Sequence, residues 1–266
     1  MEASQGYRAY ALLLHMIEQH DPAFARAIHD LPGQKPITIS PLLGAEPTRE
    51  RTIALKAGDR LWLRVTAIGE EVFARVLDCL LHAPSGSSLR VDNADFRLTR
   101  VISVPGRTIW ADCTTFDELR VRAEPARSLG VRFWSPTAFR VGGTRNFVVP
   151  MPEQVFGSLL ARWNQFSPVQ APAELRDSCR DGVWISRYRL STRMLDFGNH
   201  RELGFVGECV YEVGPVVPPA MAAWLVTLAR FAYYAGVGAK TTMGMGQASL
   251  IEPARREAAP AVTGRP

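Results

Sequence analysis

A glycine-rich segment at residues 236–247, Gly-Val-Gly-Ala-Lys-Thr-Thr-Met-Gly-Met-Gly-Gln, has the composition of an anion-binding loop. Glycine lets backbone N–H groups approach an anion closely and adopts positive φ, so such a loop can cradle a phosphate. The lysine, Lys240, is one of only three in the chain. The glycines are Gly236, Gly238, Gly244 and Gly246. The segment therefore predicts a phosphate-binding loop, with tight packing of a helix against a strand as the alternative.

Two common nucleotide-binding loops do not fit this segment. A Walker A loop requires Gly-Lys-Ser/Thr, whereas Ala239 precedes Lys240 and Tyr234 occupies the place of its first glycine. A dinucleotide fingerprint opens a helix after a strand, whereas this segment follows a helical pattern and leads into a strand-like run at 247–251. With these two kinds of nucleotide site excluded, the polyanionic ligand that the loop predicts is a nucleic acid.

His29 is the best candidate for proton transfer, because imidazoles titrate near neutral pH. It ends a short helical pattern before Pro32 and Gly33, so its side chain can project from a loop edge. From the residues alone, a surface or helix-capping histidine is the favoured interpretation. No H-x-H, D-x-D or H-E-x-x-H pattern indicates a metal site, and Asp-Asn-Ala-Asp at 92–95 is typical of a turn.

The charge balance suits a polyanionic partner. The formal net charge is +5, and 28 of the 31 basic residues are arginine. Arginine fits RNA because its planar fork binds phosphate bidentately and stacks on bases. A GC-rich genome would give any protein a similar composition, so the arginine content alone does not decide the matter.

The compartment expected from the sequence is a reducing cytoplasm. No apolar stretch approaches the roughly 18–20 residues of a membrane span, and the N-terminus lacks a basic-then-apolar signal pattern. The four cysteines form no C-x-x-C pair and are expected to be buried thiols. They are Cys79, Cys113, Cys179 and Cys209.

The second half predicts the order β-α-β-β-α-β, the ferredoxin-like arrangement. The predicted strands are 131–134, 183–195, 205–213 and 247–251, with a hairpin turn at 142–143. Apolar periodicity predicts one helix through 155–163 and another after Pro218-Pro219. In 183–195, Trp184, Tyr188, Leu190 and Met194 are expected on one face and Arg187, Arg189 and Arg193 mostly on the other.

The first half predicts the same arrangement without its opening strand. Helices are expected at 7–19, from Pro22 to about His29, and at 70–81; strands at 37–43 and 61–68, with further strand material at 88–104 and 107–111. The missing strand would be central in the sheet and would leave an unpaired edge. We therefore predict an α+β protein of two tandem ferredoxin-like domains. The predicted boundaries are domain 1–111, linker 112–129, domain 130–251 and disordered tail 252–266.

Segments spread along the chain resemble a family of RNA-processing nucleases. Asp-Pro-Ala-Phe-Ala-Arg-Ala-Ile-His-Asp at 21–30 is followed by Lys-Pro-Ile-Thr-Ile-Ser-Pro-Leu-Leu at 35–43. Phe-Trp-Ser-Pro-Thr-Ala-Phe at 133–139, and Phe-Val-Gly-Glu-Cys-Val-Tyr at 205–211 with the glycine-rich loop, complete the pattern. In this order the chain resembles the CRISPR-associated endoribonuclease that processes precursor guide RNA, in the RAMP superfamily. It departs from the pattern in Ser135, usually threonine, and in the missing first strand.

This resemblance implies metal-independent cleavage of CRISPR repeat RNA, with the RNA's own 2′-OH as nucleophile. The products would carry a 2′,3′-cyclic phosphate and a 5′-OH. His29 would be the general base or acid, and Lys35 would supply a cation for the transition-state charge. Some relatives use a second proton carrier on the first helix; Leu14 occupies that place here, and His15 lies one residue away. No cofactor and no metal are expected.

The partner implied is repeat RNA in precursor transcripts, with the glycine-rich loop against its backbone. Arg187, Arg189 and Arg193 would form a phosphate track, or else a solvated sheet face. Other CRISPR-associated proteins of an effector complex and a second copy of the chain are further possible partners. The competing function is a non-catalytic RNA-binding RAMP subunit, which would not need His29. A nucleotide-binding enzyme on a ferredoxin-like scaffold is a third candidate function.

Overall fold

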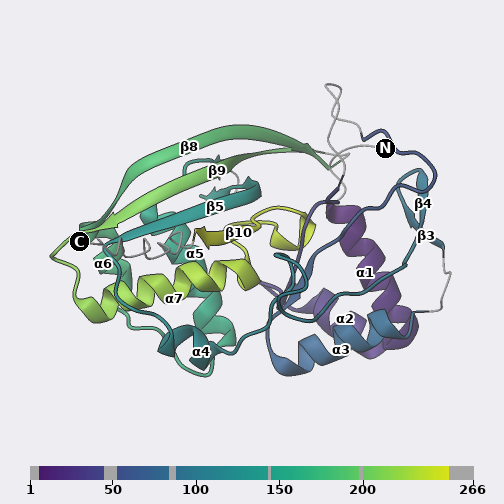
Figure 1. Ribbon diagram of the computed structural model, residues 1–266, viewed down its shortest axis with the longest axis horizontal. Coiled ribbons are helices and arrows are strands. Elements are labelled where there is room, and N and C mark those ends of the chain that lie inside the picture. Colours follow the sequence, from purple (N-terminus) through teal and green to yellow (C-terminus); the bar gives the residue numbers. More distant parts are fainter. Residues whose placement is uncertain (1–5, 45–52, 84–87, 143–144, 198–199, 252–266) are drawn as a thin grey trace, which may run out of the picture.

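The computed structural model describes residues 6–44, 53–83, 88–142, 145–197 and 200–251. Two halves lie side by side (Figure 1), each with its own cluster of buried apolar side chains. The C-terminal half is a sheet of long strands over helices, and helices α1, α2 and α3 gather in the N-terminal half. No helix among these residues is long and apolar enough to cross a membrane.

The C-terminal half is a four-stranded antiparallel sheet with the strand order β10-β5-β9-β8. Counted along this half, the order is fourth, first, third, second, which confirms the predicted ferredoxin-like arrangement. The strands are β5 Ser128–Thr137, β8 Val183–Asp196, β9 Arg201–Val213 and β10 Ala248–Ile251. Helices α5 (Pro152–Phe166) and α7 (Pro219–Ala235) pack under one face (Figure 1). A small hairpin, β6 (Phe139–Val141) with β7 (Arg145–Phe147), and α6 (Leu175–Gly182) are added to this frame.

The apolar periodicity of α5 and α7 explains how they pack. Each begins with proline, which tolerates the first turn because its missing N–H has no intrahelical partner there. The fully buried Trp163 of α5 meets the rings of Phe116, Trp224 and Phe231 edge-on, with centroids 4.9–5.5 Å apart. This aromatic cluster fixes α5 against α7 beneath the sheet.

Strand β8 departs from the simple alternation that we predicted. A register shift between Ile185 and Arg187 inserts a bulge. Trp184 consequently pairs with the outward-facing Glu212, whereas Tyr188 pairs with the buried Cys209. The expectation that Trp184 and Tyr188 share a face was wrong, because one extra residue reverses the phase of every later side chain.

The N-terminal half has the predicted order without a first strand. Helices α1 (Gly6–His20) and α2 (Pro22–Asp30) precede a two-stranded antiparallel sheet, which α3 follows. The strands are β1 Ile37–Ile39 and β2 Val65–Ala67; α3 spans Glu70–Leu81 and leads to the hairpin of β3 (Ser88–Val91) and β4 (Ala94–Arg97). Among the described residues no strand precedes α1; residues 1–5 lie outside them. The predicted turn at 92–95 joins β3 to β4, but the strands predicted over 98–104 and 107–111 are absent.

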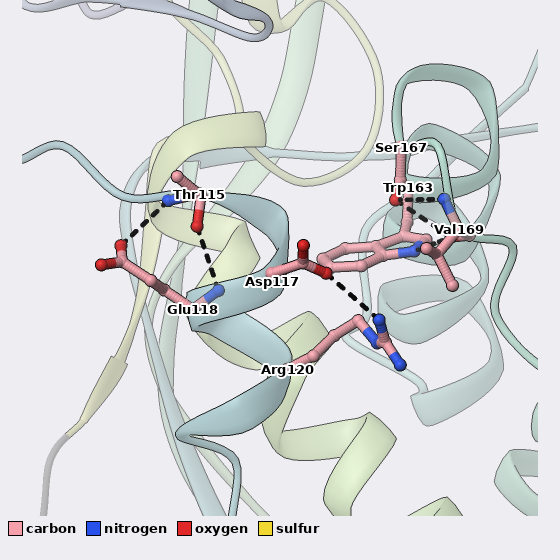
Figure 2. Close-up of polar contacts among 7 residues, drawn as sticks. All are labelled: Thr115, Asp117, Glu118, Arg120, Trp163, Ser167 and Val169. Carbon is pink, nitrogen blue, oxygen red and sulfur yellow. Dashed lines mark hydrogen bonds and ion pairs between the residues drawn. The ribbon is translucent and has the colours of Figure 1, made fainter.

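The segment predicted as a linker, 112–129, contains a helix, α4 (Phe116–Val121), and the start of β5. Figure 2 shows its capping box: the Thr115 hydroxyl accepts from the Glu118 N–H, and the Glu118 carboxylate accepts from the Thr115 N–H, both at 3.1 Å. Hydrogen bonds from the Thr115 N–H and the Thr114 hydroxyl lower the pKa of Glu118. The segment is therefore an ordered element, while the domain boundaries stay a prediction. The predicted tail, 252–266, lies outside the described residues.

The cysteines follow the prediction with one exception. Cys79, Cys179 and Cys209 are buried free thiols, whereas Cys113 is exposed. Cys113 lies in the irregular stretch just before α4, where no apolar element covers it.

Two buried arginines join the halves, one from each side. Arg64, in the N-terminal half, donates to the carbonyl of Tyr233 and the side chain of Gln247 at 2.8 Å, and its guanidinium lies 3.9 Å over the Tyr233 ring. Arg162, on α5, donates to the Gln34 side chain at 3.1 Å and to the Lys35 carbonyl at 3.3 Å. Burial lowers the pKa of both guanidinium groups, that of Arg162 to about 10, so Arg162 remains charged at neutral pH. Because arginine carries five donors in a rigid fork, each can satisfy several carbonyls across the junction.

Candidate nucleic-acid interface and active site

A cavity of about 710 Å³ lies where the N-terminal half meets the glycine-rich loop, α5 and α6. Six of its lining side chains are basic and one, Glu153, is acidic. The basic residues are Lys35, Arg140, Arg162, Arg176, Arg180 and Lys240. A concave wall with this excess of positive charge attracts polyanions and suits a phosphate backbone.

Of the predicted catalytic residues, Lys35 lines this cavity, and His29, which does not line it, is joined to Lys35 through its backbone carbonyl. The Lys35 ammonium donates to the carbonyl oxygen of His29 at 2.6 Å and to that of Leu31. These carbonyls belong to the C-terminal end of α2, where a cation is favoured by the helix dipole. The His29 ring is exposed, and its Nδ1 lies 3.0 Å from the Asp30 carboxylate. Because Asp30 accepts at Nδ1, the Nε2 of His29 is left to face a ligand.

The third candidate, His15, does not join this pair. It lies on α1 with an exposed side chain, 3.0 Å from Gln19 and 4.0 Å from Glu18 of the same helix. None of the contacts within the described residues links it to His29 or Lys35.

Packing explains the glycines of the predicted RNA-binding loop. All four have positive φ. A Cβ on Gly238 would lie 2.4 Å from the Ala138 carbonyl oxygen, and one on Gly246 would lie 2.2 Å from that of Val237. Gly236 caps α7, and Gly244 packs against Gly6. Tight packing, the alternative weighed for this loop, therefore accounts for these glycines, Gly238 included, and residues 238–242 also line the cavity.

A buried carboxylate holds Lys240 in place. Glu202 accepts from the Lys240 ammonium at 2.7 Å, from Arg140 at 2.5 Å and from Asn146. Lys240 also contacts His200 at 2.6 Å and lies 4.5 Å over the Phe197 ring. Desolvation raises the pKa of Glu202, but the hydrogen bonds from Lys240 and Asn146 outweigh it, so the net shift is downward. Glu202 therefore stays ionised and positions two cations of the cavity wall.

Replacing Glu202 by glutamine is expected to destabilise the protein by about 1–3 kcal/mol at neutral pH, because Lys240 and Arg140 lose a buried charged acceptor. A carboxyl whose pKa is lowered in the folded state stabilises the fold above its unfolded pKa of ~4.3, and this contribution is lost as the pH falls through its folded value. The difference between the two proteins should therefore shrink below about pH 4.5. Urea unfolding at pH 7 and pH 4 checks this, and Glu212→Gln on the outer sheet face is the matched control. A constant difference across this range would contradict it.

The predicted arginine stripe lies elsewhere. Arg187, Arg189 and Arg193 are exposed on β8, the edge strand of the C-terminal sheet, and none of them lines the cavity. Arg189 pairs in register with Glu208, so this face carries both signs of charge. The phosphate track stays a prediction.

Several residues of the cavity wall escaped the sequence analysis. Arg162 could have been found from the sequence, because it falls on the apolar stripe of α5 next to Trp163, where a charged residue needs a structural reason. Arg176 and Arg180 lie one turn apart on α6, and nothing in the sequence except their charge marks them. Glu202 and His200 read as ordinary surface residues and meet Lys240 only through the fold.

Comparisons with known proteins agree along the chain. A family model described as CRISPR-associated endoribonuclease Cas6 matches residues 131–248, and one for the CRISPR Cas6 N-terminal domain matches 1–120. The Cas6 endoribonuclease of Mycobacterium tuberculosis is 31% identical over 136 residues, which are 49% of this chain and 41% of that protein. That of Streptococcus thermophilus is 28% identical over 122 residues, 45% of this chain and 49% of that protein. The chain thus matches less than half the length of these curated relatives.

Solved structures match far more of the chain. A product complex of Thermus thermophilus Cas6 (TTHB231) superposes with a TM-score of 0.79 at 28% identity, covering 94% of this chain and 95% of that one. A product complex of Cas6 (TTHA0078) is 31% identical with a TM-score of 0.75, covering 91% and 92%. A RAMP protein described as binding different RNA substrates, 15% identical with a TM-score of 0.62, shares the fold. With both family models matched in order and this identity over nine-tenths of each chain, the protein belongs to the Cas6 family of CRISPR-associated endoribonucleases.

Proposed function

We propose that this chain cleaves repeat RNA in CRISPR precursor transcripts, without a metal ion. The 2′-oxygen attacks the adjacent phosphorus, a new O2′–P bond forms and the P–O5′ bond breaks. The base takes the proton of the 2′-OH, and the leaving 5′-oxygen receives one. The observation that carries the proposal is a cavity lined by six basic side chains and one acidic, among them Lys35, whose ammonium is bonded to the backbone carbonyl of His29.

Each residue of the pair has a role that its surroundings favour. His29 exchanges protons through Nε2, because Asp30 at 3.0 Å takes the other nitrogen and orients the ring. The Lys35 ammonium, held by the backbone carbonyl of His29, would supply positive charge for the negative charge that develops on the phosphorane. Both residues belong to one short segment, the end of α2 and the turn that follows.

Two observations support RNA as the ligand of the cavity: the positive charge of its wall and the ligands of related structures. Arg162 is buried in this wall and has no acidic partner among its described contacts, so its positive charge is not neutralised there. Three of the solved relatives are Cas6 complexes with a product or a substrate mimic. Another is a Cas6 mutant in which a histidine is replaced by alanine. A repeat RNA is thus the ligand that we place along residues 238–242 and α6.

One observation favours a second candidate, a non-catalytic RNA-binding subunit. The bonds from Lys35 to the carbonyls of His29 and Leu31 complete the C-terminal end of α2, which explains this lysine without any chemistry. Such a subunit would keep the basic cavity and have no use for the exposed imidazole.

The test is incubation of the full chain with labelled repeat RNA from the same genome in excess EDTA. We expect a single cut whose 5′ fragment ends in a cyclic phosphate and whose 3′ fragment accepts phosphate from a polynucleotide kinase. RNA with a 2′-deoxy sugar at the cut should bind equally and stay intact, because it lacks the nucleophile. Cleavage of the deoxy substrate would refute the mechanism, and tight binding of the normal RNA without a cut would favour the RNA-binding subunit.

A further inference from the structure

Two histidines and an aspartate meet at the C-terminal ends of α1 and α3. His20 Nε2 lies 2.7 Å from one carboxylate oxygen of Asp78, and His82 Nδ1 lies 3.0 Å from the other. The two imidazole rings are nearly parallel, at 12°, with centroids 5.5 Å apart. The three potential ligand atoms all lie within 4.8 Å of one another, and no other group of three such side chains does so within the described residues.

This donor set has the chemistry of a zinc site. Zinc binds imidazole nitrogen and carboxylate oxygen at about 2.0–2.2 Å, in tetrahedral geometry. Ligand atoms around such a centre are about 3.3 Å apart, and the three ligand atoms here lie within 4.8 Å of one another, so shifts of about 1.5 Å or less complete the geometry. All three side chains are exposed, which lets them relax and leaves a fourth position to water.

Each carboxylate oxygen of Asp78 already lies beside one imidazole nitrogen, at 2.7 Å for His20 and 3.0 Å for His82. Without a metal, the Nε2 of His20 contacts the Asp78 carboxylate, and the Nδ1 of His82 contacts both the Asp78 carboxylate and the Asp78 backbone carbonyl at 3.0 Å. A metal that displaces the imidazole protons would exchange these contacts for three coordinate bonds.

We propose that His20, Asp78 and His82 bind one Zn²⁺ ion, with water as the fourth ligand, and that this ion clamps α1 to α3. The two helices share a small core, in which Leu13 and Ile17 of α1 and Val76 of α3 are buried over a two-stranded sheet. A cross-link at their ends stabilises the half of the protein with the fewest strands. The site is separate from the cavity, which none of its three residues lines.

The experiment is a titration of Zn²⁺ into the EDTA-stripped full chain, followed by thermal unfolding and by the metal bound at equilibrium dialysis. We expect one ion per chain. At free Zn²⁺ a hundredfold above the dissociation constant, the folding equilibrium shifts by about a hundredfold, which raises Tm by about 5–10 °C. His20→Ala, His82→Ala and Asp78→Asn should each abolish the rise, and these exposed positions should tolerate the change.

Two controls separate this site from other ligands on the surface. His15→Ala removes an exposed histidine of the same helix, and Cys113→Ser removes the exposed thiol; both should keep the full rise in Tm. With Co²⁺ in place of Zn²⁺, the absorption spectrum should show no thiolate charge-transfer band, because no cysteine is a ligand. A rise that survives in His82→Ala, a rise lost in Cys113→Ser, or no rise at all would overturn the proposal. RNA cleavage in EDTA is an independent measurement, so failure of either proposal leaves the other standing.

Discussion

Replacing His29 by alanine is expected to slow the cleavage of repeat RNA by about 10²–10⁴-fold, the usual contribution of a general acid or base. The side chain is exposed and its partner is the neighbouring Asp30, so its removal should leave the fold and the RNA affinity unchanged. Single-turnover cleavage with protein in excess separates the chemical step from product release. A binding assay with the 2′-deoxy RNA then gives the affinity without turnover.

The matched control is His82→Ala in EDTA, which removes another exposed histidine that does not line the cavity. Its rate should stay within about threefold of the native protein, as for a surface substitution of small effect. If His29→Ala also cleaves at the native rate, His29 is not the proton carrier, and His15→Ala is the next variant to examine. If the rate falls only as far as the RNA affinity does, His29 binds RNA and takes no part in the chemistry.

Regular amphipathic elements could be predicted from the sequence because the apolar pattern that specifies each of them lies within its own residues. The apolar stripes of α5 and α7 and the alternation in 183–195 predicted the order of elements in the second half, which the sheet confirms. The same local rules missed α4, although Thr115 and Glu118 carry a capping-box spacing, because six residues are too few to show a helical period. The bulge in β8 has no signal of its own.

The candidate functional residues divide in the same way into those predicted from local sequence and those that depend on distant contacts. His29 and Lys35 are six residues apart, so their pairing follows from the end of one helix and could be anticipated. Contacts between residues far apart in the sequence could not be anticipated. Arg64 contacts Gln247, and His20 contacts Asp78, only because separate elements pack together. A sequence pattern can nominate a residue type at a position, but partners supplied by distant segments depend on the tertiary structure.

Arg162→Met is expected to destabilise the protein by about 2–4 kcal/mol and to reduce cleavage as well. The guanidinium donates to the carbonyls of Ala235 and Lys35 and to the Thr241 hydroxyl, and methionine fills its volume without a donor. Each buried acceptor left without a partner costs about 1–3 kcal/mol, and release of the buried charge returns part of that. Cleavage should fall because the same bonds fix the backbone of Lys35 against the glycine-rich loop.

The control for this variant is Arg176→Met, which removes an equal charge from the same cavity at an exposed position. Its stability should change by no more than about 0.5 kcal/mol, so urea unfolding separates the loss of structure from the loss of charge. RNA affinity should fall in both variants, since each removes one cation from the wall. Arg162→Lys keeps the charge without the planar fork and should lie between the native protein and Arg162→Met in stability. Equal stability of the two methionine variants would mean that Arg162 contributes only charge and does not stabilise the junction of the halves.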